Sequence, residues 1–163
     1  MNGGCTLLRM IPFRQIVVPI DFDVSSEEVT HAALDLADKY GGKITVVHVY
    51  PLPEQVYGVY AAFGGADFVG SIRVAAEKAL EEAVTPLRHR MPALTAVVRA
   101  GDAWQEIIAV ATEIGADLIV MGTHGRRGVA RVFLGSVAEK VVRRSPVPVL
   151  TIRTHGEHRS ERE

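Results

Sequence analysis

The sequence predicts a single α/β domain built on one open, doubly wound sheet of five parallel strands with helices on both faces. Apolar runs of strand length alternate along the chain with segments whose apolar residues recur at helical spacing, which is typical of successive βαβ units. The chain has 163 residues and an apolar fraction of 48%. A chain of this size and composition can bury a substantial core without disulfide or metal support.

The first third of the chain predicts a strand, a helix and a second strand. The apolar run QIVVPI at 15–20 predicts the first strand, and KITVVHVY at 43–50 predicts the second. Between them we expect a helix that starts at Ser25 or Ser26, because either hydroxyl can cap it, and that runs to about residue 40. The glycine pair that follows can end this helix through a positive φ.

Residues 51–70 differ from the rest of the chain because they are rich in proline and glycine. This composition predicts a long loop, and loops of this length in small domains are usually functional or disordered. A second helix is then expected from Ser71 to about residue 90. Pro86 lies within it and should kink or break it, since proline cannot donate to the helical ladder.

The alternation continues to the end of the domain. Pro148 lies within the last apolar run and removes one ladder donor, which favours the edge of the sheet for that strand. Asp102 is expected to cap the helix that follows it. The expected elements are a strand at 94–99, a helix at 103–114, a strand at 117–121, a helix at 137–144 and a strand at 147–152.

Composition limits the classes of partner. The formal net charge of −1 argues against a general nucleic-acid binder, which would be strongly basic. No apolar run approaches the roughly 20 residues needed to cross a membrane, and no signal peptide is evident. The single cysteine, Cys5, favours a reducing, cytoplasmic setting. We expect the domain to span 14–153, with an N-terminal arm at 1–13 and a disordered polar tail at 154–163.

The segment 122–136, GTHGRRGVARVFLGS, is the most informative part of the sequence. Gly122 and Gly125 follow a buried strand, and Gly135 and Ser136 precede an amphipathic helix. Glycine lets the backbone approach a ligand and also admits unusual φ values, while a helix N-terminus offers N–H groups to an anion. The segment therefore predicts a phosphate site, although an ordinary strand-to-helix turn is the alternative.

The spacing Gly-x2-Gly-x9-Gly-Ser resembles the nucleotide-binding signature of the universal stress protein family, and the resemblance extends over about 14–153. It implies the adenine nucleotide alpha-hydrolase-like fold, with strand order 3-2-1-4-5. It also implies binding of ATP or another adenine nucleotide, with or without Mg²⁺, in a stress response or in signalling. Family members commonly form homodimers through the last strand, here 147–152.

The resemblance also suggests roles for individual residues. The segment Pro19-Ile20-Asp21-Phe22 is similar to the family's Pro-x-Asp-x element, whose aspartate lies against the nucleoside; Asp21 could otherwise cap the next helix, the role expected for Asp23. Val49 follows His48 as in the family's His-Val pair and would form an apolar wall for adenine, while His48 is expected to be packed and hydrogen-bonded. The expected nucleotide-binding residues are Pro19, Ile20, Asp21, Val49, Met121, Gly122, Thr123, His124, Gly125, Gly135, Ser136 and Val137.

Two other functions stay open at this point. Arg126, Arg127 and Arg131 could clamp phosphates or form a solvated loop face, and the resemblance assigns them no role. No general base and no acidic pair for Mg²⁺ is evident, so a catalytic residue and a metal ligand are not identified. A slow ATPase or phosphotransferase is the first alternative, and a nucleotide-independent interaction module is the second.

Overall fold

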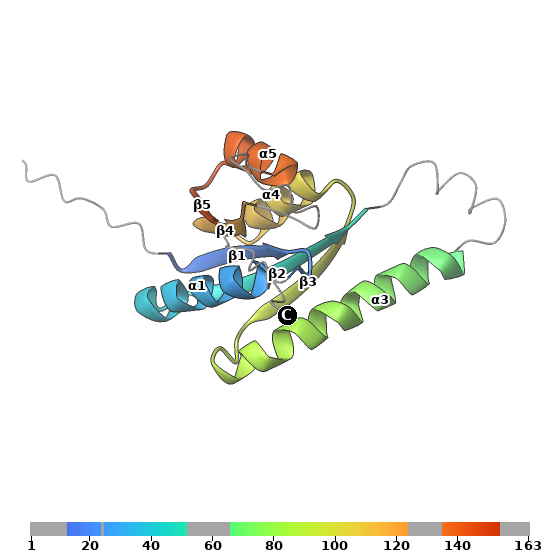
Figure 1. The fold of residues 1–163 in the computed structure, drawn as a ribbon, viewed down its shortest axis with the longest axis horizontal. Coiled ribbons are helices and arrows are strands. Elements are labelled where there is room, and N and C mark those ends of the chain that lie inside the picture. The colour runs from blue at the N-terminus through green and yellow to red at the C-terminus, as the bar shows by residue number, and fades with distance from the viewer. Residues whose placement is uncertain (1–12, 24, 52–65, 124–134, 154–163) are drawn as a thin grey trace, which may run out of the picture.

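Five parallel strands form one open sheet in the order β3-β2-β1-β4-β5 (Figure 1). The structure is a computed structural model and describes residues 13–23, 25–51, 66–123 and 135–153. Both the five-stranded parallel sheet and its order are therefore as expected. In chain order the elements are β1 (Gln15–Ile20), α1 (Ser25–Tyr40), β2 (Lys43–Tyr50), α3 (Ala66–Val84), the 3₁₀ helix η1 (Thr85–His89), β3 (Thr95–Ala100), α4 (Ala103–Glu113), β4 (Leu118–Gly122), α5 (Ser136–Arg144) and β5 (Val149–Ile152).

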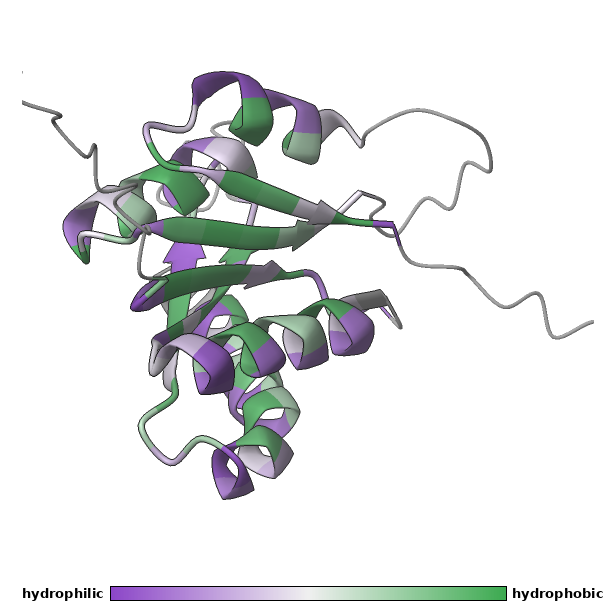
Figure 2. Ribbon diagram, turned by 90° about the vertical axis from the view of Figure 1, so that its left-hand side faces the viewer, coloured by the Kyte–Doolittle hydropathy of each residue, from purple (hydrophilic) through white to green (hydrophobic). Residues whose placement is uncertain are grey.

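Helices cover both faces of the sheet. α1 and α3 lie on one face, and α4 and α5 lie on the other (Figure 1). Alternate residues of β1 enter the two cores: Ile16 and Val18 pack with α1 and α3, whereas Val17 packs with α4. The strands are mostly hydrophobic and the helices turn their polar sides outward (Figure 2), as expected for a sheet buried on both faces.

β1 lies at the centre of the sheet and marks the point where the strand order reverses. It pairs with β2 from Gln15↔Lys43 to Ile20↔His48, and with β4 at Ile16↔Leu118 and Val17↔Ile119. The chain therefore builds outward from β1 first through β2 and β3, and then on the other side through β4 and β5. In open α/β sheets, ligands bind at such a reversal, beyond the carboxyl ends of the strands.

The predicted β-α-β unit at the start of the domain is confirmed. β1 and β2 have the expected bounds, and α1 ends at Tyr40. Gly41 follows with φ +65°, so the first glycine of the pair does supply the positive φ that ends the helix. Gly42 is needed for a different reason, because a Cβ there would lie 2.4 Å from the carbonyl oxygen of Phe13.

The bounds of α3 differ from those that the sequence predicts. The helix begins at Ala66 rather than Ser71, so Gly70 lies inside a helix and not in a loop. The stripe Ala76, Leu80 and Val84 is buried against the sheet, and this packing outweighs the cost of about 1 kcal/mol for one helical glycine. Pro86 breaks the helix as expected: α3 ends at Val84, and the chain continues as η1 with Pro86 in its first turn.

Two further expectations require correction. Asp102 precedes α4, but its side chain makes no capping hydrogen bond; its carboxylate accepts from the indole Nε1 of Trp104 at 2.7 Å. The last strand begins at Val149, after Pro148, and is two residues shorter than expected because proline lacks the N–H that would extend the ladder. Its position at the edge of the sheet, next to β4 only, is as expected.

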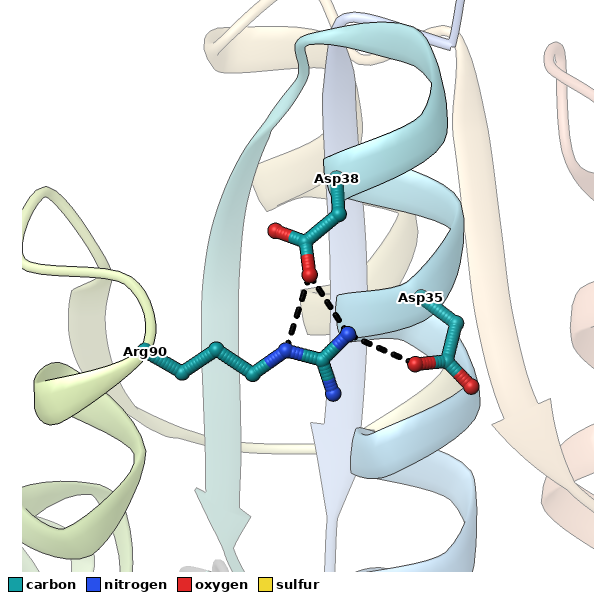
Figure 3. A network of polar contacts seen from close by, with 3 residues as sticks. All are labelled: Asp35, Asp38 and Arg90. Carbon is teal, nitrogen blue, oxygen red and sulfur yellow. Dashed lines mark hydrogen bonds and ion pairs between the residues drawn. The ribbon is translucent and has the colours of Figure 1, made fainter.

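Arg90, just after η1, ties the end of the α3–η1 segment to α1 (Figure 3). Its guanidinium donates from Nε to Asp38 at 2.8 Å and from Nη2 to Asp35 at 2.6 Å. The two carboxylates are nearly one helical turn apart and therefore share one planar cation. Hydrogen bonds from Arg90 to Asp35 and then to Asp38 raise the pKa of the guanidinium above its ordinary value, so the contact keeps its charge at any physiological pH.

Arg90→Ala is expected to lower the midpoint of thermal unfolding by a few degrees at low salt. The variant leaves two neighbouring aspartates without their shared cation, and the difference from the wild type should shrink as salt screens the charges. Arg73→Ala is the control, because Arg73 pairs with Glu77 of its own helix, at 3.8 Å. Equal effects of the two substitutions in scanning calorimetry would show that the contact between Arg90 and α1 contributes no more to thermal stability than an ordinary surface ion pair.

Candidate functional site

The end of β4 and the beginning of α5 are held together by the backbone. The Gly135 N–H donates to the Thr123 carbonyl at 2.7 Å, and the Thr123 N–H donates to the Ile152 carbonyl at 3.1 Å. The N-terminus of α5 is therefore fixed beside the carboxyl end of β4. The sequence predicts a phosphate site here, at the carboxyl ends of the strands.

The first turn of α5 presents donor groups at these strand ends. The first intrahelical bond runs from the Glu139 N–H to the Gly135 carbonyl at 2.8 Å, so the N–H groups of Ser136, Val137 and Ala138 precede the helical ladder. Ser136 is exposed, and its hydroxyl lies at the same helix end. This arrangement suits an anion, since the N-terminus of a helix carries a partial positive charge.

Gly135 has φ −56° and ψ 151°, values that any residue can adopt. The reason for glycine at this position is therefore not an unusual φ, which was one of the two reasons that the sequence left open. Close approach of a ligand to the backbone is the other reason, and it agrees with the position of Gly135 at the N-terminus of α5.

β1 is the neighbour of β4 in the sheet, so the turn after β1 leaves the sheet at the same end as the N-terminus of α5. Oδ1 of Asp21 accepts from the Asp23 N–H at 3.2 Å and from the Ser26 hydroxyl at 3.1 Å. Asp21 therefore orders the turn into α1, which was the alternative role for this residue. One carboxylate can accept several hydrogen bonds, so this contact leaves room for a second role.

Phe22 is strained in a way that the sequence does not reveal. Its φ is +64°, a left-handed conformation that is rare for a bulky side chain and that tends to occur at functional sites. Its ring packs on the imidazole of His48 with 4.2 Å between the centroids. Nδ1 of His48 lies 3.0 Å from the Ile20 carbonyl, so His48 is packed and hydrogen-bonded as expected. His48 therefore contacts both neighbours of Asp21, the backbone of Ile20 and the ring of Phe22.

Three apolar members of the predicted site lie in one cluster, whereas Ile20 packs against the core on the α1–α3 face. Met121 is 5% exposed on β4, and the partly buried Val49 of β2 and Val137 of α5 pack against the same core on the α4–α5 face. These three residues come from different elements and lie close to the strand ends that carry the polar groups. They can form an apolar wall next to the donors of α5.

The structure thus brings together most of the predicted residues. Pro19 and Ile20 end β1, Asp21 follows it, and Gly122 ends β4 beside β1. His124 and Gly125 lie outside the described residues, as do the three loop arginines. The sequence missed the support given by Ser26 and Phe22; the Ser26 hydroxyl could have been suspected from its place in the first turn of α1, but the φ of Phe22 could not.

Two other observations bear on the chemistry of the site. Among the described residues, no group of three or more His, Cys, Asp or Glu side chains could hold a metal ion. The basic residues of α5 are engaged: Arg143 pairs with Glu139 at 2.7 Å, and the guanidinium of Arg144 lies 4.6 Å from the Trp104 ring centroid.

Within the described ranges no helix is long and apolar enough to span a membrane.

Comparisons with known proteins agree with this architecture. The model of the universal stress protein family matches residues 12–153. A universal stress protein of Thermus aquaticus is 33% identical over 148 residues, which cover 86% of this chain and 99% of that protein. The universal stress protein UspA of Lactobacillus plantarum has the same fold, with a TM-score of 0.71, 22% identity, and coverage of 86% of this chain and 98% of that one.

Two further structures of this fold contain adenine nucleotides. A universal stress protein in complex with cAMP superposes with a TM-score of 0.62 at 24% identity, covering 88% of this chain and 99% of that chain. One from Archaeoglobus fulgidus in complex with dAMP superposes with a TM-score of 0.61 at 23% identity, covering 86% and 98%. At these identities the likeness shows the fold alone.

The sheet order and the helix end at its reversal define an open, doubly wound α/β protein of the adenine nucleotide alpha-hydrolase-like fold. The family match covers all of the described residues. The chain belongs to the universal stress protein family.

Proposed function

We propose that this protein binds ATP, or another adenine nucleotide, at the carboxyl ends of β1 and β4 and acts in a stress response or in signalling. The observation that carries the proposal is the Gly135–Thr123 hydrogen bond, which holds the N-terminus of α5 at the reversal of the sheet order. The first N–H groups of α5 and the Ser136 hydroxyl then receive the phosphates.

The nucleoside would lie toward β1 and β2. Asp21 provides a carboxylate for the ribose hydroxyls, and Val49, Met121 and Val137 provide apolar surface for the base. The relatives in complex with cAMP and dAMP support an adenine ligand. If Mg²⁺ accompanies ATP, the phosphates and water can supply most of its ligands, since this ion usually keeps several waters.

Mass spectrometry of the purified protein under non-denaturing conditions tests this proposal directly, because a co-purified nucleotide would be identified by its mass. Calorimetric titration of nucleotide-free protein with ATP, ADP, AMP and GTP then ranks the ligands. We expect the adenine nucleotides to bind more tightly than GTP. No binding of any nucleotide at millimolar concentration would contradict the proposal and favour a nucleotide-independent interaction module.

Asp21→Ala is expected to weaken binding of ATP, ADP and AMP alike by about 1–3 kcal/mol, the usual contribution of a charge-assisted hydrogen bond. The three ligands should be affected equally because they share the ribose that Asp21 contacts. Isothermal titration calorimetry with each ligand measures the effect. A loss confined to ATP would instead place Asp21 near the terminal phosphate.

Ser26→Ala is the matched control for Asp21→Ala. It removes the hydroxyl that donates to Asp21 at 3.1 Å but keeps the carboxylate itself. If Asp21 contacts the nucleoside, Ser26→Ala should retain most of the affinity. If Asp21 acts only by ordering the turn into α1, the two variants should lose similar affinity.

Slow ATP hydrolysis or phosphotransfer is the second candidate function, and it shares this site. It would need a general base beside the terminal phosphate, and the sequence identifies none. A cytoplasmic setting is part of the main proposal and rests on the single cysteine, Cys5, which allows no intrachain disulfide.

A homodimer through β5 is also part of the proposal. β5 lies at the edge of the sheet, where it pairs with β4 on one side only. Leu150 on this strand is 40% exposed, and Val142 of α5 is 47% exposed. An unpaired strand edge with apolar side chains invites pairing, and two copies of β5 related by a two-fold axis would pair antiparallel.

A further inference from the structure

On the other face of the sheet, a groove of about 370 Å³ lies between α1 and the α3–η1 segment. Its floor is formed by Ile20 of β1 and the buried Val46 of β2. Phe22 lines it near α1, and Val84 and Leu87 line it from α3 and η1. A concave site of this size with an apolar floor is typical of small-molecule sites.

The rim of the groove is acidic. Asp23 and Glu27 lie on the α1 side, Glu82 lies on the α3 side, and no lysine or arginine belongs to the described lining. Carboxylates therefore stand on both sides of an apolar floor. His31 is the other ionisable residue of the lining, and its imidazole can accept a hydrogen bond when neutral.

The arginines of η1 and of the position just after it form ion pairs with other carboxylates. Arg88 pairs with Glu81 at 2.9 Å, and Arg90 binds Asp35 and Asp38. Among the described residues, Lys78 lies 3.9 Å from Glu82 at the rim. The two side chains are 77% and 70% exposed, and such a pair contributes little. The groove thus combines apolar surface with the negative charge of Glu27 and Glu82 at its rim.

We propose that this groove binds a small organic cation, an alkyl- or arylammonium compound with an apolar body. The apolar body would cover Ile20, Val46 and Leu87, and the ammonium group would lie near the carboxylates of Glu27 and Glu82. The Phe22 ring adds a favourable surface for a cation. An anion of the same shape is repelled by the rim, and a neutral analogue lacks the charge contacts.

The proposed groove site is separate from the proposed nucleotide site. Ile20 is the single residue common to the described lining of the groove and the predicted nucleotide-binding set. The turn that follows β1 separates the two sites, because Asp21 serves one while Phe22 and Asp23 line the other. The inference therefore holds or fails independently of nucleotide binding.

The test uses the full chain, labelled with ¹⁵N, and three probes with one carbon skeleton: 3-phenylpropylamine, 3-phenylpropanol and 3-phenylpropanoate. The amine is expected to shift the backbone amide signals of Thr30, Val84 and Leu87, which line the groove. ATP, in a parallel titration, should shift those of Val49, Met121 and Gly135 instead. The two proposals can thus fail separately.

Three variants locate the effect. Glu27→Gln combined with Glu82→Gln should weaken amine binding by about tenfold, because two ion pairs are lost, and should leave alcohol binding unchanged. Glu28→Gln is the matched control, since Glu28 is an exposed neighbour on α1 that does not line the groove. Ala83→Phe should reduce binding of the amine and the alcohol, because Ala83 lines the groove and is exposed.

The outcomes divide clearly. Preference for the amine, with the double variant weaker than Glu28→Gln, supports the proposal. Equal binding of the amine and the propanoate overturns it. So does an amine that shifts the nucleotide-site signals instead of the groove signals, or one that shifts neither set at millimolar concentration.

Discussion

Replacing Gly135 with valine is expected to weaken ATP binding by more than about a hundredfold, to below detection, while the protein stays folded. Gly135 has φ −56° and ψ 151°, which valine adopts readily, and its N–H can still donate to the Thr123 carbonyl. The added side chain would instead occupy the space where phosphates approach the first turn of α5. Calorimetric titration measures the loss of binding.

Two variants make this test specific. Gly135→Ala adds a single methyl group and should give an intermediate loss. Gly70→Val is the control, because a Cβ at Gly70 meets no atom within 4 Å and the residue lies in α3. Circular dichroism and thermal unfolding verify the fold of each variant. A folded Gly135→Val protein with wild-type affinity would remove the N-terminus of α5 from the binding site.

Leu150→Asp is expected to convert the proposed homodimer into a monomer. Leu150 is 40% exposed on the edge strand β5, whereas Val149 and Ile152 on the same strand pack against the two cores of the domain. A charge at position 150 therefore spares the fold but must lose its water twice in a two-fold interface, once in each subunit. Sedimentation velocity over a range of concentrations distinguishes the two states.

Val74→Asp serves as the control for the dimer test. Val74 is 57% exposed on α3, on the opposite face from α5, so a charge there should not alter an interface at β5. A wild-type protein that sediments as a monomer at high concentration contradicts the dimer itself. A Leu150→Asp protein that remains dimeric places the interface on another surface.

Much of the fold could be predicted from the sequence because its signals are local. The apolar runs of β1 and β2 and the glycine pair after Tyr40 defined their elements to the residue. The strand order needed the family resemblance, since periodicity does not say which strands are neighbours. The start of α3 was wrong because the glycine and proline density of 51–70 suggested a loop, whereas Gly70 lies inside the helix.

The candidate site shows a similar division. Spacing placed Gly135 and Ser136 at a helix entry, and the structure puts them there. The side-chain partners could not be foreseen: Asp102 contacts Trp104 instead of capping α4, and Phe22 has a left-handed φ that its residue type disfavours. The groove between α1 and α3 depends on how far the two helices stand apart, and no local pattern specifies that distance.

The backbone bond between Gly135 and Thr123 has a consequence for how this protein can change over evolution. This bond holds the last residue before the 124–134 connection next to the first residue after it. The entropy of closing a loop grows only slowly with length, by about 0.6 kcal/mol for each doubling. Insertions, deletions and substitutions within 124–134 should therefore cost the fold little, so ligand preference can diverge there while the strand end and the helix stay in place.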